Sequence, residues 1–299
     1  MNSPILIVGF NRPDKLISNL DTISKWAVPH IYISIDGPTD ESTKDITKGI
    51  KIYLQKFESN QKYTIWINDT NLGISRNISE AISRILLVEK TLVVIEDDVV
   101  LNENVFLSIS KILHSHNHDK LGLVGGFSAI PAPPKIFTKL IRNKFRPSVR
   151  INVWGWGVTR TAWELYERDL SKIDLGKVLS VSKSWNKLSS KQRNIWMKRF
   201  QKVAKDPNYT WDFQLQFMTF RYDLQNYLPR FRAVDNTGFD SALSTNTKNK
   251  KPKTIFGRTD PRAIDKIEEN PFIIWLLIKL ELWNDSRVSI TRLVNKFKI

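Results

Sequence analysis

The sequence predicts an α/β protein in which a mostly parallel sheet is flanked by helices. Two observations predict this class. Short apolar runs of strand length alternate with helical patterns over the first 120 residues, and several of these runs end in polar or glycine-containing turns. Strands that alternate with helices are typical of a doubly wound parallel sheet. A chain of 299 residues can also bury the core that such a sheet requires.

The expected strands are apolar and rich in β-branched residues, as buried parallel strands are. They span residues 5–10, 31–35, 63–67, 91–95 and 121–124. The expected helices lie between and after them, at about 14–26, 44–57, 77–86, 105–116 and 192–204. Asn11 is the expected N-cap of the first helix, and Pro13 occupies its first turn.

Composition limits the classes of partner. The formal charge of +16 comes from 46 basic and 30 acidic residues, and the basic ones concentrate in 135–150, 183–205 and 248–262. Such an excess favours phosphate-bearing substrates, an anionic membrane surface or nucleic acid. The absence of cysteine excludes disulfides and thiolate metal sites. Neither a signal peptide nor an apolar run of the ~18 residues that span a bilayer is expected.

Three consecutive acids follow the strand at 91–95. Glu96, Asp97 and Asp98 cannot lie cheaply in an apolar core, so this end of the strand is expected at a surface or a cation. Hard divalent ions take oxygen ligands, and the carboxyl ends of parallel strands are where α/β sheets bind ligands. The triplet therefore indicates an Mn²⁺ or Mg²⁺ site, with an acidic surface turn as the alternative.

Other polar turns are expected at the same sheet edge. They contain Asn11, Asp36 and the segment 71–76. Neither a Gly-x-Gly-x-x-Gly fingerprint nor a Walker-type loop accompanies them, so a bound nucleotide would depend on a metal and individual side chains.

Further motifs follow in a fixed order: Trp-Gly-Trp-Gly at 154–157, Trp-Asp at 211–212 and Asn-Thr-Gly-Phe-Asp at 236–240. With the acidic triplet, they make the chain from about 4 to 244 resemble a metal-dependent, inverting glycosyltransferase of the GT-A fold. The resemblance is to bacterial relatives of the N-acetylglucosaminyltransferase that begins complex N-glycan branching. It implies a GT-A type sheet and transfer of a hexosyl or N-acetylhexosaminyl group.

The resemblance also implies roles for single residues. Asp98 would be the direct metal ligand. The nucleotide-sugar donor, expected to be a UDP-sugar, would be bound by Asn11, Arg12, Asp36, Arg76, Glu96 and Asp97. Two of these residues have ordinary alternatives: Asp36 in an Asp-Gly-Pro turn, and Arg76 on an exposed helix face.

Asp212 is the expected catalytic base, because inversion needs a carboxylate that takes the acceptor's proton. Its alternative is the N-cap of a helix that begins at Phe213. Trp154, Trp156 and Trp211 are candidates for acceptor or sugar contact, with core packing as the rival.

Two histidine features depart from the family pattern. No histidine follows His118, so Ser244, Thr245 or a basic residue would replace the usual carboxyl-terminal His. The His114-x-His116-x-His118 segment is interpreted as a solvated helix terminus rather than a metal site.

The expected organisation is a donor-binding half (1–125), an acceptor and base half of the same domain (126–260), and a basic, amphipathic helical segment (261–299). This last segment would either close the core, which is favoured because Trp275 and Leu276 need burial, or lie on an anionic leaflet.

The predicted function is bacterial surface glycan synthesis on a saccharide or lipid-linked acceptor, in the cytoplasm or at the inner membrane face. The alternatives are a sugar nucleotidyltransferase and a non-catalytic polyanion-binding protein; nucleic acid is disfavoured because the acids would repel it.

Overall fold

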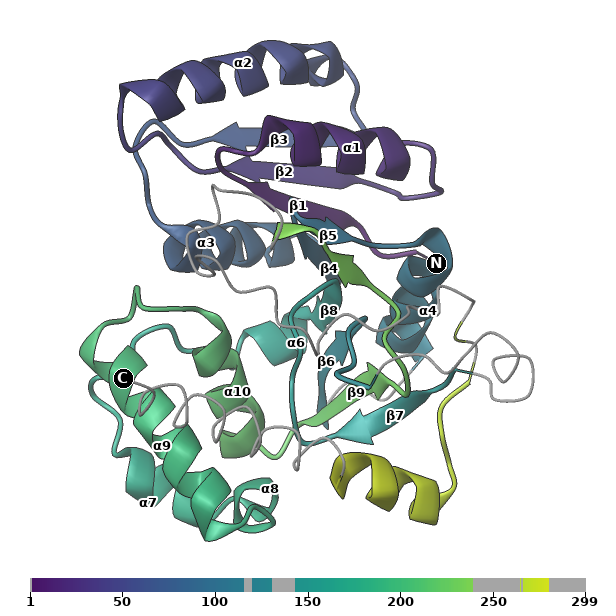
Figure 1. Cartoon of the computed structure of the whole chain (residues 1–299), viewed down its shortest axis with the longest axis vertical. Coiled ribbons are helices and arrows are strands. Elements are labelled where there is room, and N and C mark those ends of the chain that lie inside the picture. The colour runs from purple at the N-terminus through teal and green to yellow at the C-terminus, as the bar shows by residue number, and fades with distance from the viewer. Residues whose placement is uncertain (1, 116–119, 131–142, 239–263, 265, 280–299) are drawn as a thin grey trace, which may run out of the picture.

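The computed structural model describes residues 2–115, 120–130, 143–238, 264 and 266–279. An eight-stranded sheet runs through the molecule in the order β3-β2-β1-β4-β8-β6-β9-β7 (Figure 1). Its first four strands are parallel: β1 (Ile5–Gly9), β2 (Ile31–Ile35), β3 (Tyr63–Ile67) and β4 (Thr91–Glu96). Helices cover both of its faces, so the predicted α/β class with a mostly parallel sheet is confirmed.

The second half of the sheet is mixed. It contains β6 (Leu121–Gly125), β7 (Phe145–Ser148), β8 (Trp156–Thr159) and β9 (Gln225–Pro229). β8 is antiparallel to both of its neighbours, β4 and β6, whereas β9 is parallel to β6. The sequence did not predict β7, β8 or β9, because their residues become strand only through partners distant in the chain.

Two layers of helices bury the sheet. One face packs against α1 (Pro13–Ile23), α2 (Glu41–Glu58) and α4 (Glu103–Ser115), and the other against α3 (Ile74–Leu86), α6 (Arg160–Trp163) and α10 (Asp212–Arg221). Successive side chains of a strand point to opposite faces. Ile5 and Ile7 accordingly join the first core cluster, and Leu6 and Val8 join the second.

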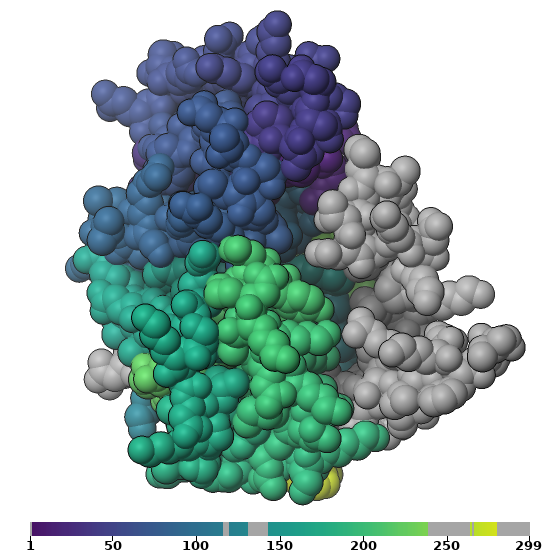
Figure 2. Space-filling model, turned by 90° about the vertical axis from the view of Figure 1, so that its left-hand side faces the viewer, coloured from purple at the N-terminus to yellow at the C-terminus, as the bar shows by residue number. Residues whose placement is uncertain are grey.

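A helical lobe lies at the end of the molecule opposite α2 and β3 (Figure 1). It comprises α7 (Leu175–Ser180), α8 (Lys183–Asn186) and α9 (Ser190–Lys205), packed with α10 around an aromatic core that includes Trp185, Trp196 and Phe200. Figure 2 shows the blue surface of the amino-terminal half passing directly into the teal and green surface of this lobe.

One local prediction was wrong: the N-cap of α1 is Arg12, not Asn11, and it makes no side-chain cap bond, because a guanidinium group carries only donors. A helix spans residues 271–279, in which Leu277 is 6% exposed, whereas Phe272, Trp275 and Leu276 are 66%, 54% and 41% exposed. Trp275 instead stacks on Phe272, so burial of these side chains within the described chain is not what holds the helix. None of the helices in the described ranges combines the length and hydrophobicity needed to cross a bilayer.

Candidate active site

The acidic triplet lies where β4 ends. Glu96 is the last residue of β4 and is partly buried, and Asp97 and Asp98 are the turn into β5 (Val99–Val100), at only 3% and 8% exposure. β5 pairs antiparallel with β10 (Asp235–Asn236). In Figure 1 this two-stranded sheet lies beside β1 and β4, so it brings the segment at 236–238 to the acids.

Arg12 bridges the two aspartates. Its Nη1 donates to Asp98 Oδ2 at 2.7 Å, its Nε donates to Asp97 Oδ2 at 3.2 Å, and its Nη2 donates to Asp97 Oδ1. β1 and β4 are neighbouring parallel strands, so the residue that follows β1 lies beside the turn that follows β4. Arg12, predicted as a donor-binding residue, is thus a direct partner of the acids in this structure; its contact with a donor stays a prediction.

Two residues of α1 that the sequence analysis missed also hold this site. Asn19 Nδ2 donates to the carbonyl oxygens of Asp97 at 2.8 Å and Val99 at 3.2 Å. Lys15 Nζ donates to the carbonyl oxygen and to Oγ1 of Thr237, the latter at 3.1 Å. Positions three to four residues apart share a helix face. The spacing of polar residues at 12, 15 and 19 was therefore a usable signal.

The segment 236–238 closes over Asp98. Asn236 Nδ2 donates to Asp98 Oδ1 at 3.2 Å, and the Thr237 N–H donates to the Asp98 carbonyl oxygen at 2.8 Å. A Cβ placed on Gly238 would lie 2.0 Å from Asp98 Oδ2, so a larger residue here would displace the Asp98 carboxylate. Residues 239–263, which include Asp240, Ser244 and Thr245, lie outside the described chain.

The acids carry more negative charge than Arg12 balances. Burial, followed by the charges of Asp98 and Asp97, raises the pKa of Glu96 to about 8. Burial also raises the pKa of Asp97 to about 6, although Arg12 opposes that shift. The charge of Asp212 contributes to the raised pKa of Glu96, which places Asp212 within electrostatic reach of the triplet.

Asp212 is the first residue of α10, and Trp211 is its N-cap. The sequence analysis gave Asp212 as a possible N-cap of a helix that begins at Phe213. This alternative was wrong, because the helix begins at Asp212 itself. Burial raises the pKa of Asp212, whereas a hydrogen bond from Thr210 Oγ1 and bonds from the N–H groups of Asp212 and Phe213 oppose the shift. A carboxylate with a raised pKa suits a general base, but the catalytic role of Asp212 stays a prediction.

Asp36 follows β2 in a tightly held turn. Its Oδ1 accepts hydrogen bonds from the N–H groups of Gly37 at 3.0 Å and Leu72 at 2.8 Å, and from Asn68 Nδ2 at 3.4 Å. In the part of the chain that the structure describes, Oδ2 accepts none. A Cβ on Gly37 would lie 2.2 Å from the Thr70 carbonyl carbon, so this turn also requires glycine. These bonds fit the turn interpretation, and a nucleotide contact of Asp36 stays a prediction.

Arg76 and Asn11 are not bonded to the acids. Arg76 lies on α3 with half of its side chain exposed, and its Nε donates to Glu80 Oε1 one helical turn along. This is the exposed helix-face arrangement that the sequence left as the alternative. Asn11 is partly buried beside Arg12. Donor contacts of Arg76 and Asn11 stay predictions.

The three tryptophans differ in burial. Trp156 is 1% exposed and Trp211 is 4% exposed, and their rings stack with centroids 5.5 Å apart. Trp154 is partly buried and packs edge-on against Phe127 at 4.5 Å. Burial favours core packing for Trp156 and Trp211, whereas Trp154 keeps some accessible surface. Contact with an acceptor stays a prediction for all three.

Within the described ranges, no three His, Asp or Glu side chains form a preassembled metal site. The donor chemistry nevertheless fits a divalent ion, because the acids offer hard oxygen atoms and an excess of negative charge. Mg²⁺ commonly binds one or two carboxylates together with substrate phosphates, which a single ligand at Asp98 would satisfy. His114 instead lies within hydrogen-bonding distance of Thr91 Oγ1 (3.3 Å), and His116 and His118 lie outside the described residues.

No protein-family model and no curated protein matches the chain. Solved structures resemble it at low identity. A mannosyltransferase from Pyrobaculum calidifontis, in complex with GDP-Man and Mn²⁺, is 13% identical over 56% of this chain and 47% of its own, with a TM-score of 0.37. GalNAc-T7 with UDP, GalNAc and Mn²⁺ is 10% identical over 76% of this chain and 42% of its own, with a TM-score of 0.44. The 4-diphosphocytidyl-2C-methyl-D-erythritol synthase from Anaerococcus prevotii is 12% identical over 76% of this chain and 86% of its own, with a TM-score of 0.38. The chain thus spans less than half the length of the first two proteins.

Proposed function

We propose that this chain is a GT-A type glycosyltransferase that moves a hexosyl or N-acetylhexosaminyl group from a nucleotide-sugar, expected to be a UDP-sugar, to an acceptor hydroxyl. One observation carries the proposal. Three buried or partly buried acids lie at the carboxyl end of a central parallel strand, where burial and their own charges raise the pKa values of Glu96 and Asp97, and the charge of Asp212 adds to the shift of Glu96. A purely structural turn has no reason to retain such a charge excess, whereas a site for a cation and a diphosphate does.

The donor side of the site follows from these residues. Asp98 would hold the divalent ion, which when bound supplies neutralising charge to the diphosphate leaving group. Asp97 and Glu96 would orient the ribose, the sugar or bound water, and Asp36 would contact the nucleobase. Arg12 holds Asp97 and Asp98 in place.

The acceptor side depends on Asp212. This carboxylate takes the proton from the acceptor hydroxyl while that oxygen attacks the sugar from the face opposite the leaving group, which inverts the configuration. Thr210 Oγ1 donates a hydrogen bond to Asp212 Oδ1 and so helps to orient the carboxylate. The raised pKa of Asp212 makes it a stronger base than an ordinary aspartate.

Calorimetry with UDP tests the donor site. The wild-type chain should bind UDP much more tightly with Mn²⁺ than without it, and Asp98→Ala should abolish this metal-linked binding while the fold survives. Asp14→Ala is the matched control, because Asp14 is an exposed acid of neighbouring α1. Binding that is unchanged in Asp98→Ala would remove the site from consideration.

A sugar nucleotidyltransferase is the second candidate. That class needs a glycine- and arginine-rich loop after the first strand, and here the loop is Gly9-Phe-Asn-Arg-Pro13, whose arginine bonds to Asp97 and Asp98. Metal-dependent binding of a nucleoside triphosphate in preference to UDP would favour this candidate. A non-catalytic polyanion-binding protein explains the charge of +16 but not the acids.

The acceptor is proposed to be a saccharide or lipid-linked glycan of the bacterial surface, reached from the cytoplasmic membrane face. The support is the exposed aromatic pair Phe272 and Trp275 on a helix of a strongly basic chain. Aromatic residues and positive charge together favour the interface of an anionic bilayer. Co-sedimentation with vesicles containing phosphatidylserine should be strong at low salt, weak at high salt, and reduced by Trp275→Ser. Absence of binding at low salt would leave a soluble acidic glycan as the acceptor.

A further inference from the structure

The helix α9 has a face of lysines that its own sequence does not balance. Every charged residue of this helix is a lysine or an arginine. The spacing of four exposed lysines places them on one side of the helix, here called the lysine face: Lys191, Lys198, Lys202 and Lys205. Within the described residues, these lysines form no ion pair. Like charges three or four residues apart on a helix repel each other, so an anion bound to this face would stabilise it.

The side of α9 that carries Lys202 adjoins the candidate base. Arg199 and Lys202 are three residues apart and therefore share a side of the helix. The Arg199 Cζ lies 5.3 Å from the ring centroid of Phe213, the residue that follows Asp212. Burial raises the pKa of Asp212, and the charge of Arg199 is among the effects that oppose this rise. The positive charge of α9 thus reaches the carboxylate that would accept the acceptor's proton.

Tyr209 adds an accessible aromatic ring at the same place. It is 52% exposed, and its ring centroid lies 6.2 Å from that of Phe213. Lys202 Nζ lies 5.2 Å from the centroid of the Tyr209 ring and 3.5 Å from its hydroxyl oxygen. A sugar ring presents apolar C–H groups that can pack on an aromatic face, and a lysine beside that face can bind an anionic group of the same sugar.

The loop that carries Tyr209 is attached to the sheet edge where the acids lie. Ser75 Oγ lies 3.0 Å from the carbonyl oxygen of Pro207 and 3.2 Å from that of Thr210. Ser75 is in the first turn of α3, which follows β3. This turn therefore lies at the carboxyl edge of the parallel strands, as the acids after β4 do. The loop between α9 and α10 is held between the lysine face and the donor side of the site.

From the lysine face, the exposed ring and their position beside Asp212, we propose that Tyr209 and Lys202 bind an acceptor saccharide that carries phosphate or carboxylate groups. The inference rests on the proposed function and names its acceptor class. The sugar ring would pack on Tyr209, and its anionic group would bind Lys202. An anionic bilayer fits this surface less well. In the described chain α9 exposes no large apolar side chain, because its apolar side is buried in the lobe.

Charged and neutral sugars test the acceptor class. Trigalacturonate supplies carboxylates and mannose 6-phosphate supplies a phosphate, and maltotriose and mannose are their neutral counterparts. In saturation-transfer NMR titrations, the wild-type chain should bind at least one charged sugar with a dissociation constant about tenfold below that of its neutral counterpart. The charged sugar that binds identifies the anionic group. Absence of binding of both charged sugars at about 10 mM, or equal binding of the neutral ones, would overturn the proposal.

Substitutions locate the binding surface. Lys202→Gln should raise the dissociation constant of the charged sugar about fivefold, the effect of one exposed ion pair. Tyr209→Ala should weaken binding by about the same factor, whereas Tyr209→Phe keeps the ring and should bind normally. Circular dichroism checks that each variant is folded. Wild-type affinity in both Lys202→Gln and Tyr209→Ala would place the sugar elsewhere and overturn the proposal.

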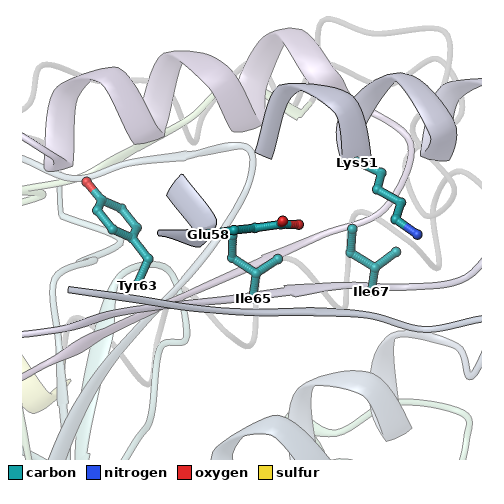
Figure 3. Close-up of a pocket in the computed structure, with 5 residues that line it drawn as sticks. All are labelled: Lys51, Glu58, Tyr63, Ile65 and Ile67. Atoms are coloured by element: carbon teal, nitrogen blue, oxygen red, sulfur yellow. The ribbon is translucent and has the colours of Figure 1, made fainter. Parts of the chain in front are cut away.

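Lys51→Gln is the matched control. It removes the same charge from α2, at the end of the molecule opposite the lobe, where Lys51 lines a groove of about 360 Å³ between α2 and β3 (Figure 3). This variant should bind the charged sugar as the wild type does. An equal loss in Lys51→Gln and Lys202→Gln would mean that net charge alone attracts the sugar, which would also overturn the proposal.

Two further measurements separate this inference from the others. Metal-linked binding of UDP without binding of a charged sugar would leave the donor site in place and overturn this inference alone. Binding of a charged sugar without metal-linked binding of UDP would refute the proposed function and, with it, the acceptor role. If Lys202→Gln reduces co-sedimentation with phosphatidylserine vesicles but leaves sugar binding unchanged, the lysine face binds a bilayer and the proposal is wrong.

Discussion

The turns after β2 and β4 have similar positions but differ in how their carboxylates are held. Both follow buried parallel strands at the same sheet edge, and both place aspartate there. At the first turn, Asp36 Oδ1 accepts two backbone N–H bonds, and the chain around it is fixed by them. At the second, three acids share one arginine, and the pKa of Glu96 rises to about 8. Asp36 completes a turn, whereas burial and mutual repulsion raise the pKa values of Glu96 and Asp97 although Arg12 lies beside them.

The surroundings of these aspartates distinguish a structural role from a chemical one better than the residue type does. An aspartate at a strand end is common in turns, because its oxygen can accept neighbouring backbone N–H groups. Charge that the fold leaves uncompensated requires another explanation, such as a ligand of opposite sign. The acids after β4 are the candidates for this second case, with Arg12 and Lys15 as the basic residues that act on Asp97 in the described chain.

The largest expected effect on the chemical site is that of changing Asp212. Asp212→Asn should leave donor binding intact and lower turnover by ~10²–10⁴, the range for a lost general base. Since the base acts deprotonated and its pKa is raised, wild-type activity should fall with decreasing pH at a value above the ordinary aspartate pKa of 3.8. Near-normal turnover of Asp212→Asn with a verified donor and acceptor would move the base elsewhere, with Asp240 as the next candidate.

The Asp36 turn should respond as a structural element. Asp36→Ala leaves the N–H groups of Gly37 and Leu72 without their acceptor, which should lower the free energy of unfolding by about 1–3 kcal/mol in urea denaturation. Asp36→Asn keeps an acceptor oxygen and should cost much less. If Asp36→Asn folds normally but binds UDP weakly, the charge of Asp36 serves the donor as well as the turn. Equal stability of Asp36→Ala and wild type would contradict the structural role.

The smallest expected effect has the opposite sign. Near neutral pH the buried Glu96 carboxyl, with its pKa raised to about 8, is kept protonated in the folded protein but ionises in the unfolded chain. Glu96→Gln removes this cost and should raise the free energy of unfolding by about 1 kcal/mol in the absence of metal, while donor turnover falls. Glu80→Gln, on the exposed face of α3, is the control and should change stability by less than about 0.5 kcal/mol. Destabilisation by Glu96→Gln would show that the fold does balance the triplet.

The sequence predicted the amino-terminal half of the sheet well. β2 and β3 have the predicted bounds, because buried parallel strands are continuous apolar runs and can be recognised without their partners. β8 and β9 could not be recognised in this way. Trp-Gly-Val-Thr resembles a turn, and Gln-Asn-Tyr-Leu-Pro is too polar; both become strand through neighbours far away in the chain.

The candidate site also contains residues that the sequence predicted and residues that it did not. The acidic triplet was visible because a carboxylate run at the end of an apolar strand is conspicuous in the sequence. The spacing of Lys15 and Asn19 places them on one face of α1 with Arg12, but their partners at Thr237, Asp97 and Val99 follow only from the adjacency of β1 and β4 and of β5 and β10. Burial of Trp156 and Trp211 likewise depends on the packing of α10 against β8, which local sequence does not encode.

The antiparallel placement of β8 has a consequence for assembly during synthesis. β4 and β6 have no direct pairing, and β8 hydrogen-bonds to both. A growing chain that has passed β6 but not β8 therefore carries two unsatisfied strand edges, one on each side of the missing partner. Such edges recruit other chains, so a ribosome-bound fragment is exposed to aggregation during this interval. For the same reason, a fragment that ends at residue 125 would lack the strand that covers the edge of β4, and we expect it to aggregate rather than fold alone.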